Sequence, residues 1–342
     1  MRAAFGPPAR YLQKEEQMAI VTPGDVPSAV PPAKPAAVAP APSVAGGRRW
    51  DAATLLFLGP PAVLLAIFLI YPTIYTIALS FNRGRRGEFT EWVGLQHYIG
   101  LLNDKAFINL GTFPPSGAIW NNVLWAIFYT SFVIFLGLIV AVLASRVRYE
   151  SIIKAIVFLP MAIAATALAI IWNFVYAPDP NIGLLNAILD PFTDRSISWL
   201  GNPGLVNASL IGAGIWGSVG FATVILSAAL KSIPTEVLEA ARTDGANERQ
   251  IFFRIILPMV SLPISVLAVT LLVNVIKLFD LIYVLTNGGP GVSSRVIAFT
   301  MYYESIPGGQ FGRGAAITVV MLILLLPIMA YNIRRFRSSR VV

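Results

Sequence analysis

The chain of 342 residues has no cysteine, a single histidine, His97, and few charges, at 12% of its residues. Without cysteine, neither a disulfide nor a thiolate metal site can form, and one histidine excludes a site built from several imidazoles. No nucleophile–base set is visible either, so we expect no catalytic residue, metal ion or cofactor on this chain. A phosphate-binding loop needs a glycine directly before a lysine, and none of the lysines follows a glycine: Lys14, Lys34, Lys105, Lys154, Lys231 and Lys277.

Apolar residues, by contrast, are abundant: 56% of the chain is hydrophobic and the mean hydropathy is +0.71. A soluble domain is about 45–50% apolar and about 25% charged, so this chain needs the bilayer as part of its solvent. Crossing about 30 Å of hydrocarbon takes about 20 helical residues. We therefore predict an all-α integral membrane protein whose domain covers residues 51–337, with six spans near 55–81, 119–145, 152–176, 205–230, 259–285 and 315–333.

Residues 1–50 differ from the rest, because the stretch 23–42 is mostly Pro, Ala and Val without a helical or strand period. Such composition predicts a disordered or polyproline-like tail. A proline-motif ligand is the alternative to a plain tether. Residues 338–342 form a short second tail.

The basic residues predict the orientation. An even number of spans places both termini on one side, and the positive-inside rule makes the side richer in Lys and Arg cytoplasmic. The side of the termini carries Arg48, Arg49, Arg146, Arg148, Lys154, Lys231, Arg242, Arg249, Arg254, Arg334, Arg335, Arg337 and Arg340. The other side carries Arg83, Arg85, Arg86, Lys105, Arg195, Arg295 and Arg313. We therefore expect cytoplasmic termini, and we interpret the net charge of +8 as a topology signal beside anionic lipid, without nucleic acid as a partner.

A charged segment lies between the fourth and fifth predicted spans. Pro234 suits the first position of a helix over 235–242, and Gly245 supplies the backbone freedom to end it. Asn247 is a good cap for a second helix over 248–256, which Pro258 would end or kink. Two short helices against the inner face of the bilayer fit a docking site for a partner, or else an amphipathic interfacial loop.

The spacing of this segment resembles the EAA loop of ATP-binding cassette (ABC) importer permeases. The residues that match are Glu239, Ala240, Ala241, Asp244, Gly245, Ile255, Leu257 and Pro258. A second stretch, from Phe279 and Asp280 to Gly288-Gly289-Pro290, resembles the permeases of the maltose-type carbohydrate group, as does Val93 to Tyr98. The runs 277–280 and 331–336 are similar to those of α-glucoside permeases.

The resemblance implies a type I permease fold of six helices with a cytoplasmic coupling helix between helices 4 and 5. It implies import of a sugar or oligosaccharide across a bacterial or archaeal plasma membrane. The implied partners are a second homologous permease, two ATPase subunits that hold ATP and magnesium, and an extracytoplasmic solute-binding protein. The eight matching residues would contact the ATPase.

A polar line marks the fifth predicted span: Thr270, Asn274, Lys277 and Asp280 are spaced by 4, 3 and 3 residues and would share one helix face. A lysine inside a span costs about 2.5–3.5 kcal/mol, so it normally faces the bundle and pairs, here with Asp280. The line could form a wall of the solute pathway, a structural ion pair, or a lysine that reaches the interface. The resemblance favours the pathway, with Tyr283 stacking on a sugar ring. A secondary transporter that uses Lys277 and Asp280 as its ion-coupling pair is the rival hypothesis.

Overall fold

The structure is a computed structural model that describes residues 52–84, 87–193 and 195–338. The chain divides into two units, residues 1–60 and residues 61–342. Of the first unit, residues 52–60 are described, and they belong to helix α1 (Ala52–Leu65). The tail predicted for residues 1–50 lies outside the described residues, as do residues 339–342.

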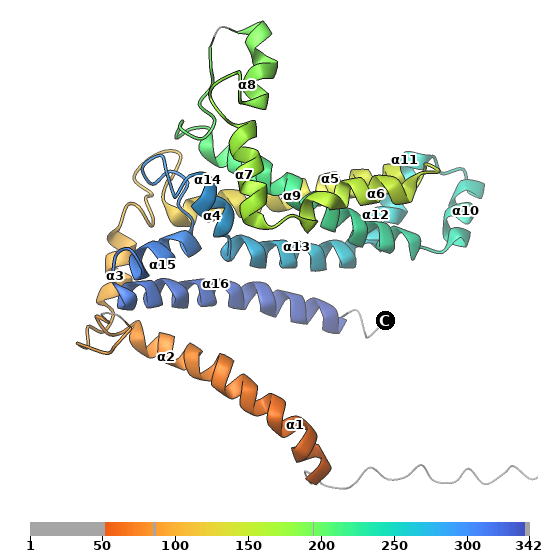
Figure 1. The fold of residues 1–342 in the computed structure, drawn as a ribbon. Helices are drawn as coiled ribbons and strands as arrows, with labels where there is room; N and C mark the ends of the chain where they lie inside the picture. The colour runs from red at the N-terminus through yellow and green to blue at the C-terminus, as the bar shows by residue number, and fades with distance from the viewer. Residues whose placement is uncertain (1–51, 85–86, 194, 339–342) are drawn as a thin grey trace, which may run out of the picture. The chain divides into compact units, whose positions relative to one another are not determined.

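Every named element in the described residues is helical, which confirms the all-α prediction (Figure 1). Four apolar helices are long enough to cross a bilayer: Leu56–Leu79, Ala118–Ala144, Val206–Lys231 and Phe311–Arg335. The first consists of α1, the π-helix η1 (Ala66–Ile70) and α2 (Tyr71–Leu79). The second consists of α4 (Ala118–Leu124), the π-helix η2 (Trp125–Tyr129) and α5 (Thr130–Ala144), while the others are α9 (Val206–Lys231) and most of α16 (Phe311–Ser338).

The third predicted span is not one straight helix. It consists of α6 (Glu150–Phe158), the 3₁₀ turn η3 (Leu159–Ala162) and α7 (Ala165–Val175), and the chain bends by 99° between the two halves. Pro160 has no N–H to donate and disturbs the turn before it, and Ile163 and Ala164 then adopt extended backbone with ψ of 134° and 141°. The span predicted over 152–176 is therefore a bent pair of helices.

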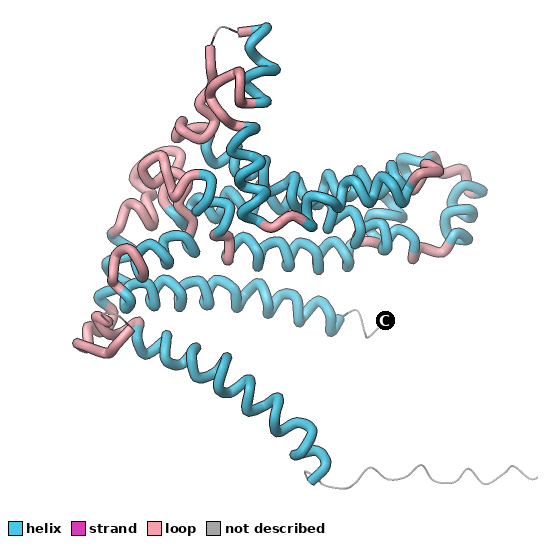
Figure 2. The backbone as a smooth tube through the Cα atoms, viewed as in Figure 1, coloured by secondary structure: helices cyan, strands magenta, loops and turns pink. Residues whose placement is uncertain are grey.

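The fifth predicted span is also interrupted. A bend of 61° follows Met259, where α13 (Ser261–Ile276) begins, and a second break separates α13 from α14 (Asp280–Leu285). The break between α13 and α14, and the bend between α6 and α7 in the third span, are visible as loop segments in Figure 2. If each bent pair counts as one span, the described residues hold up to six spans, the number predicted from hydropathy.

Small residues let the central helices approach closely. A Cβ on Gly137 of α5 would lie 2.5 Å from the Cβ of Ala222 on α9, and one on Gly220 would lie 2.4 Å from the Val157 carbonyl of α6. Close contact between backbones is the usual means of helix association in membranes. The core around this contact is apolar and includes Trp125, Leu210, Leu226, Leu267 and Phe299.

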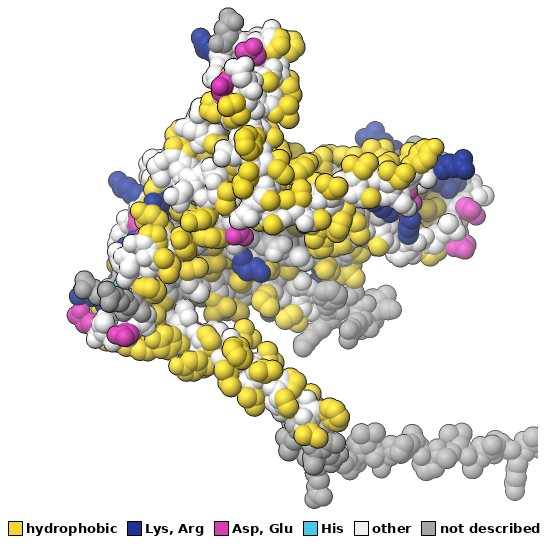
Figure 3. Space-filling view, in the orientation of Figure 1, with side chains coloured by type: hydrophobic (Ala, Val, Ile, Leu, Met, Phe, Trp, Pro, Cys, Tyr) yellow, Lys and Arg dark blue, Asp and Glu magenta, His cyan; other side chains and the backbone are white. Residues whose placement is uncertain are grey.

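The remaining helices are shorter. They are α3 (Gln96–Asn103), α8 (Leu184–Leu189), the 3₁₀ turn η4 (Asp190–Phe192), and α15 (Ile297–Ser305), which packs along α16. Between α9 and α13 lie α10 (Thr235–Thr243), α11 (Glu248–Ile251), the π-helix η5 (Phe252–Ile256) and α12 (Leu257–Met259). Hydrophobic side chains cover much of the visible side of α6, whereas charges gather around α10 and α11 (Figure 3).

Candidate functional site

The charged segment folds as a short helix, a glycine turn and a second helix. Gly245 has φ of +83°, and the N–H of Ala246 donates to the Ala241 carbonyl (3.0 Å) while the Gly245 N–H donates to the Arg242 carbonyl (3.0 Å). These two bonds form a Schellman motif, which satisfies carbonyls that the end of α10 would leave unpaired. Gly245 therefore ends the helix as predicted. Pro234 precedes the helix as its N-cap instead of occupying its first position.

The second helix begins as the sequence predicts but continues further. The Asn247 side chain accepts from the Gln250 N–H (2.9 Å), and the Gln250 side chain accepts from the Asn247 N–H (2.9 Å), which is a capping box. The helix then passes through the π-helical η5 and α12 to Met259, so Pro258 does not end it. The wider π turn directly before the proline accommodates a residue that cannot donate an N–H, and the bend comes later, at Val260.

The eight predicted coupling residues divide by exposure. The side of α10 and its turn that faces away from the fold presents Glu239, Ala240, Asp244 and Gly245, all exposed. Ala241 is buried, Ile255 and Leu257 are half-buried, and Pro258 is exposed further along the chain. The exposed set is small, carries two carboxylates and has a rigid backbone turn, so it can bind a complementary surface.

The polar line of the fifth span does not lie on one helix. Thr270 and Asn274 belong to α13, Lys277 is its C-cap, and Asp280 and Tyr283 belong to α14, beyond a break at Phe279 with φ of −138° and ψ of −60°. The expectation of a single continuous stripe is therefore wrong. The predicted ion pair is also wrong: among the ion pairs of the described residues, none joins Lys277 to Asp280. Asn274, Lys277, Asp280 and Tyr283 are all exposed, and Thr270 is half-buried.

An aromatic cluster lies beside this break. The ring of Tyr283 stacks on Phe279 with centroids 5.3 Å apart and an interplanar angle of 18°, and Tyr302 of α15 meets both rings edge-on, at 5.5 Å and 5.0 Å. Tyr283 remains 43% exposed. The prediction named Tyr283 but missed Tyr302, because no spacing in the sequence relates the two.

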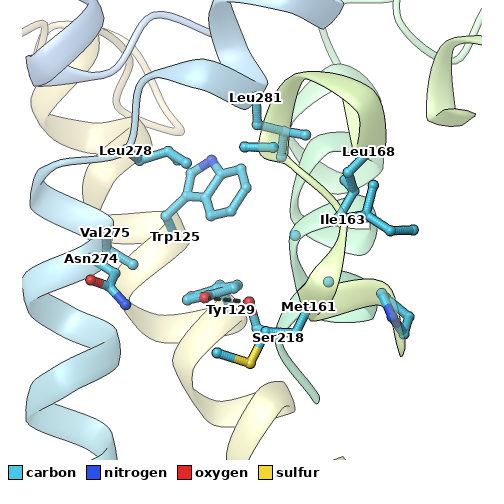
Figure 4. Close-up of a pocket in the computed structure, with 14 residues that line it drawn as sticks. Trp125, Tyr129, Met161, Ile163, Leu168, Ser218, Asn274, Val275, Leu278 and Leu281 are labelled. Atoms are coloured by element: carbon cyan, nitrogen blue, oxygen red, sulfur yellow. Dashed lines mark hydrogen bonds between the residues drawn. The ribbon is translucent and has the colours of Figure 1, made fainter. Parts of the chain in front are cut away.

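A cavity of about 220 Å³ lies between the bend that joins α6 to α7 and the break that separates α13 from α14 (Figure 4). Asn274 and Leu278 line it from α13 and the break after it, Met161 and Ile163 line it from the bend after α6, and Trp125 closes it from η2. The Tyr129 and Ser218 hydroxyls bond each other across it at 2.8 Å. Irregular backbone at membrane depth is tolerated where it lines a cavity or is buried in protein, and both breaks of this chain meet that condition. Of the predicted pathway residues, Asn274 alone lines this cavity.

Two neighbouring asparagines on α4 were also missed. Buried Asn122 donates to the Val275 carbonyl (2.9 Å) near the end of α13 and accepts from the Ile297 N–H (2.8 Å) at the start of α15. Asn121 donates to the carbonyls of Ser293 (2.8 Å) and Arg295 (2.7 Å). A pair of amides inside an otherwise apolar segment was the available signal, since buried polar groups need partners.

The chain is similar to known transport proteins. Residues 133–340 match the family described as the binding-protein-dependent transport system inner membrane component. The osmoprotective compounds uptake permease protein GgtC of Synechocystis sp. is 42% identical over 288 residues, which are 83% of this chain and 99% of that protein. The alpha-glucoside transport system permease protein AglF of Rhizobium meliloti is 42% identical over 292 residues, 84% of this chain and 82% of that protein.

A solved structure shares the fold. The crystal structure of a bacterial ABC transporter involved in the import of the acidic polysaccharide alginate has a TM-score of 0.66 and 25% identity, covering 82% of this chain and 94% of that one. The family match spans more than half of the chain, and relatives above 30% identity cover more than four-fifths of it. This multi-pass chain therefore belongs to the inner membrane components of binding-protein-dependent transport systems, and it is the permease subunit of an ABC importer.

Proposed function

We propose that this permease imports a sugar or a small polyhydroxylated osmolyte, with α-glucosides as the first class to test. The observation that carries the proposal is the group of exposed polar and aromatic side chains at the break between α13 and α14. Asn274 can both donate to and accept from hydroxyls, Lys277 donates, Asp280 accepts, and the exposed face of Tyr283 can stack on a sugar ring. The names of the relatives GgtC and AglF support a solute of this kind.

The coupling role is proposed for the segment from α10 to α12. Glu239, Ala240, Asp244 and Gly245 would contact an ATPase subunit, because they are exposed and held by the capped turn. Buried Ala241 and half-buried Ile255 and Leu257 would fix the segment on the permease, and Pro258 would set the wide turn that leads to the bend at Val260. ATP and its magnesium ion would bind to that ATPase chain.

The proposed assembly contains a second homologous permease, two ATPase subunits and an extracytoplasmic solute-binding protein. A lateral partner is supported by the exposed apolar side chains of the first span from residue 61 on, among them Leu64, Phe68 and Ile74. Cytoplasmic termini are supported by the basic residues and by Arg335 near the end of α16, which donates to the Ser261 carbonyl (3.2 Å) at the start of α13. That contact places the end of α16 near the coupling segment.

The proposed mechanism is alternating access. ATP would close the ATPase dimer and displace α10, and the displacement would reach the solute pathway through α12 and α13, between the bend at Val260 and the break at Lys277. The cavity beside Asn274 and the exposed groups near Asp280 would then face one side of the membrane and the other in turn. Hydrolysis would reset the bundle.

Transport by the complete complex in proteoliposomes tests the proposal. Uptake of a radiolabelled α-glucoside should require ATP and the binding protein, and Tyr283→Ala and Asp280→Asn should raise the solute concentration for half-maximal uptake while the complex still assembles. Phe192→Ala, at an exposed aromatic residue of η4 outside the proposed site and coupling elements, is the control and should leave uptake unchanged. Uptake driven by an ion gradient without ATP would instead support a secondary transporter.

A further inference from the structure

The short turn between α5 and α6 contacts the start of the coupling segment. Glu150, the first residue of α6, accepts from the Lys231 ammonium at 2.9 Å and from Lys154. Lys231 is the last residue of α9, and residues 232–234 join it to α10. The Glu150 side chain is only 22% exposed, so solvent screens this pair less than an open surface pair.

The same turn contacts the far end of α10 through α11. Glu248, the first residue of α11, pairs with Arg242 of α10 at 3.0 Å and with Arg146 of the α5–α6 turn at 3.8 Å. Figure 1 shows α10 and α11 at the end of the helices where α5 and α6 meet. One carboxylate on each side of α10 therefore joins the turn to the coupling segment.

We propose that the α5–α6 turn is a second transmission element, in which Arg146 and Glu150 position the coupling segment at both of its ends. Displacement of α10 would then move the α5–α6 pair directly, in addition to the route through α12 and α13. The α6 side of this pair leads to the bend at Ile163, which lines the central cavity. The inference rests on the proposed docking role of α10.

Pairs between exposed groups such as Arg146 and Glu248 add little to folding stability, so their loss should leave the protein folded. A loss of transmission without a loss of stability is the signature of a positioning role. A merely structural role would change stability first, and an incidental pair would change nothing.

Charge exchange in the reconstituted complex tests the proposal. Arg146→Glu and Glu248→Arg should each lower the solute transported per ATP hydrolysed by up to about fivefold, the ratio that corresponds to the strongest exposed ion pairs. The double variant restores opposite charges between positions 146 and 248, so it should recover the part of the loss that comes from this pair, while the pair of Glu248 with Arg242 stays broken. Arg148→Glu is the matched control, because this exposed arginine of the same turn makes no ion pair among the described residues, and it should leave the ratio unchanged.

Three measurements separate the outcomes. Thermal unfolding in detergent identifies a variant that fails to fold, in which case Arg146→Gln and Glu248→Gln replace the reversals. Glu239→Arg tests docking alone: if the ATPase still co-purifies and transport stays coupled, the proposed function fails. If Glu239→Arg releases the ATPase but both reversals at Arg146 and Glu248 keep normal coupling, or the double variant recovers nothing, the transmission role of the turn is overturned.

Discussion

Replacement of Gly245 offers the sharpest test of the coupling segment. This glycine has φ of +83° in the Schellman turn that ends α10, and a Cβ added to it would meet nothing within 4 Å. Substitution therefore adds backbone strain without a clash inside the subunit. For an L-residue the left-handed region costs about 1–2 kcal/mol, which lowers the ratio of closed to open turn by a factor of about 5–30.

That factor sets the expected binding effect. If a partner recognises only the closed turn, its apparent dissociation constant equals the intrinsic constant divided by the fraction of molecules with a closed turn. For Gly245→Ala we expect the dissociation constant of the ATPase subunit to rise by up to the same factor of about 5–30. Gly245→Asn should lose less, because asparagine populates positive φ several-fold more often than most residues.

The order of the variants decides the physical cause. If backbone strain governs, ATPase affinity measured on the detergent-solubilised permease should fall in the order Gly, Asn, Ala. If the glycine instead allows close approach of the ATPase surface, the larger side chain should be worse and the order becomes Gly, Ala, Asn. The order Gly, Ala, Asn, or wild-type affinity in the alanine variant, would refute the argument from the Schellman turn. Gly100→Ala, in the helix α3 with open space around the new Cβ, is the control.

Three further changes test the permease itself. Gly220→Ala places a Cβ 2.4 Å from the Val157 carbonyl and 2.6 Å from the Phe158 Cα, so α6 must move away from α9; we expect a lower unfolding temperature, whereas Gly100→Ala should be neutral. Asn122→Leu leaves the buried Ile297 N–H without its partner, which should cost about 1–3 kcal/mol in unfolding free energy, and an unchanged stability would contradict this. Lys277→Met should lower uptake with little change in stability if Lys277 faces a water-filled pathway, whereas a charge facing lipid would cost about 2.5–3.5 kcal/mol and its removal should stabilise the protein instead.

Local chemistry made part of this fold predictable. Long apolar runs located the spans, because the bilayer requires about 20 helical residues whatever the tertiary contacts. Gly245 and Asn247 were predictable because a Schellman turn and a capping box use atoms within a few residues of each other. A proline inside a span, such as Pro160, is typical of a kink, but the size of the 99° bend depends on how α7 packs against α14.

The break after Lys277 was not predictable in the same way. Residues 277–279 contain neither glycine nor proline, and the polar spacing before them favours a continuous helix. The Val275 carbonyl accepts from Asn122, a residue far away in the chain, as well as from the Leu278 N–H. This partner stabilises the end of α13, and a distant partner leaves no periodic signal in the sequence.

The helix α13 relates the two halves of the proposed mechanism. It is an uninterrupted run from Ser261 to Ile276, about 24 Å long at about 1.5 Å per residue. Its first end follows the coupling segment, and its last end adjoins Asn274, Lys277 and the cavity between the helix breaks. A straight helix between two bends moves as one unit and can transmit a displacement from one end to the other. If the helix continued through residues 277–279, Asp280 and Tyr283 would move together with α13. In the proposed mechanism, the break would let α14 keep its contacts with α7 and Tyr302 while α13 moves.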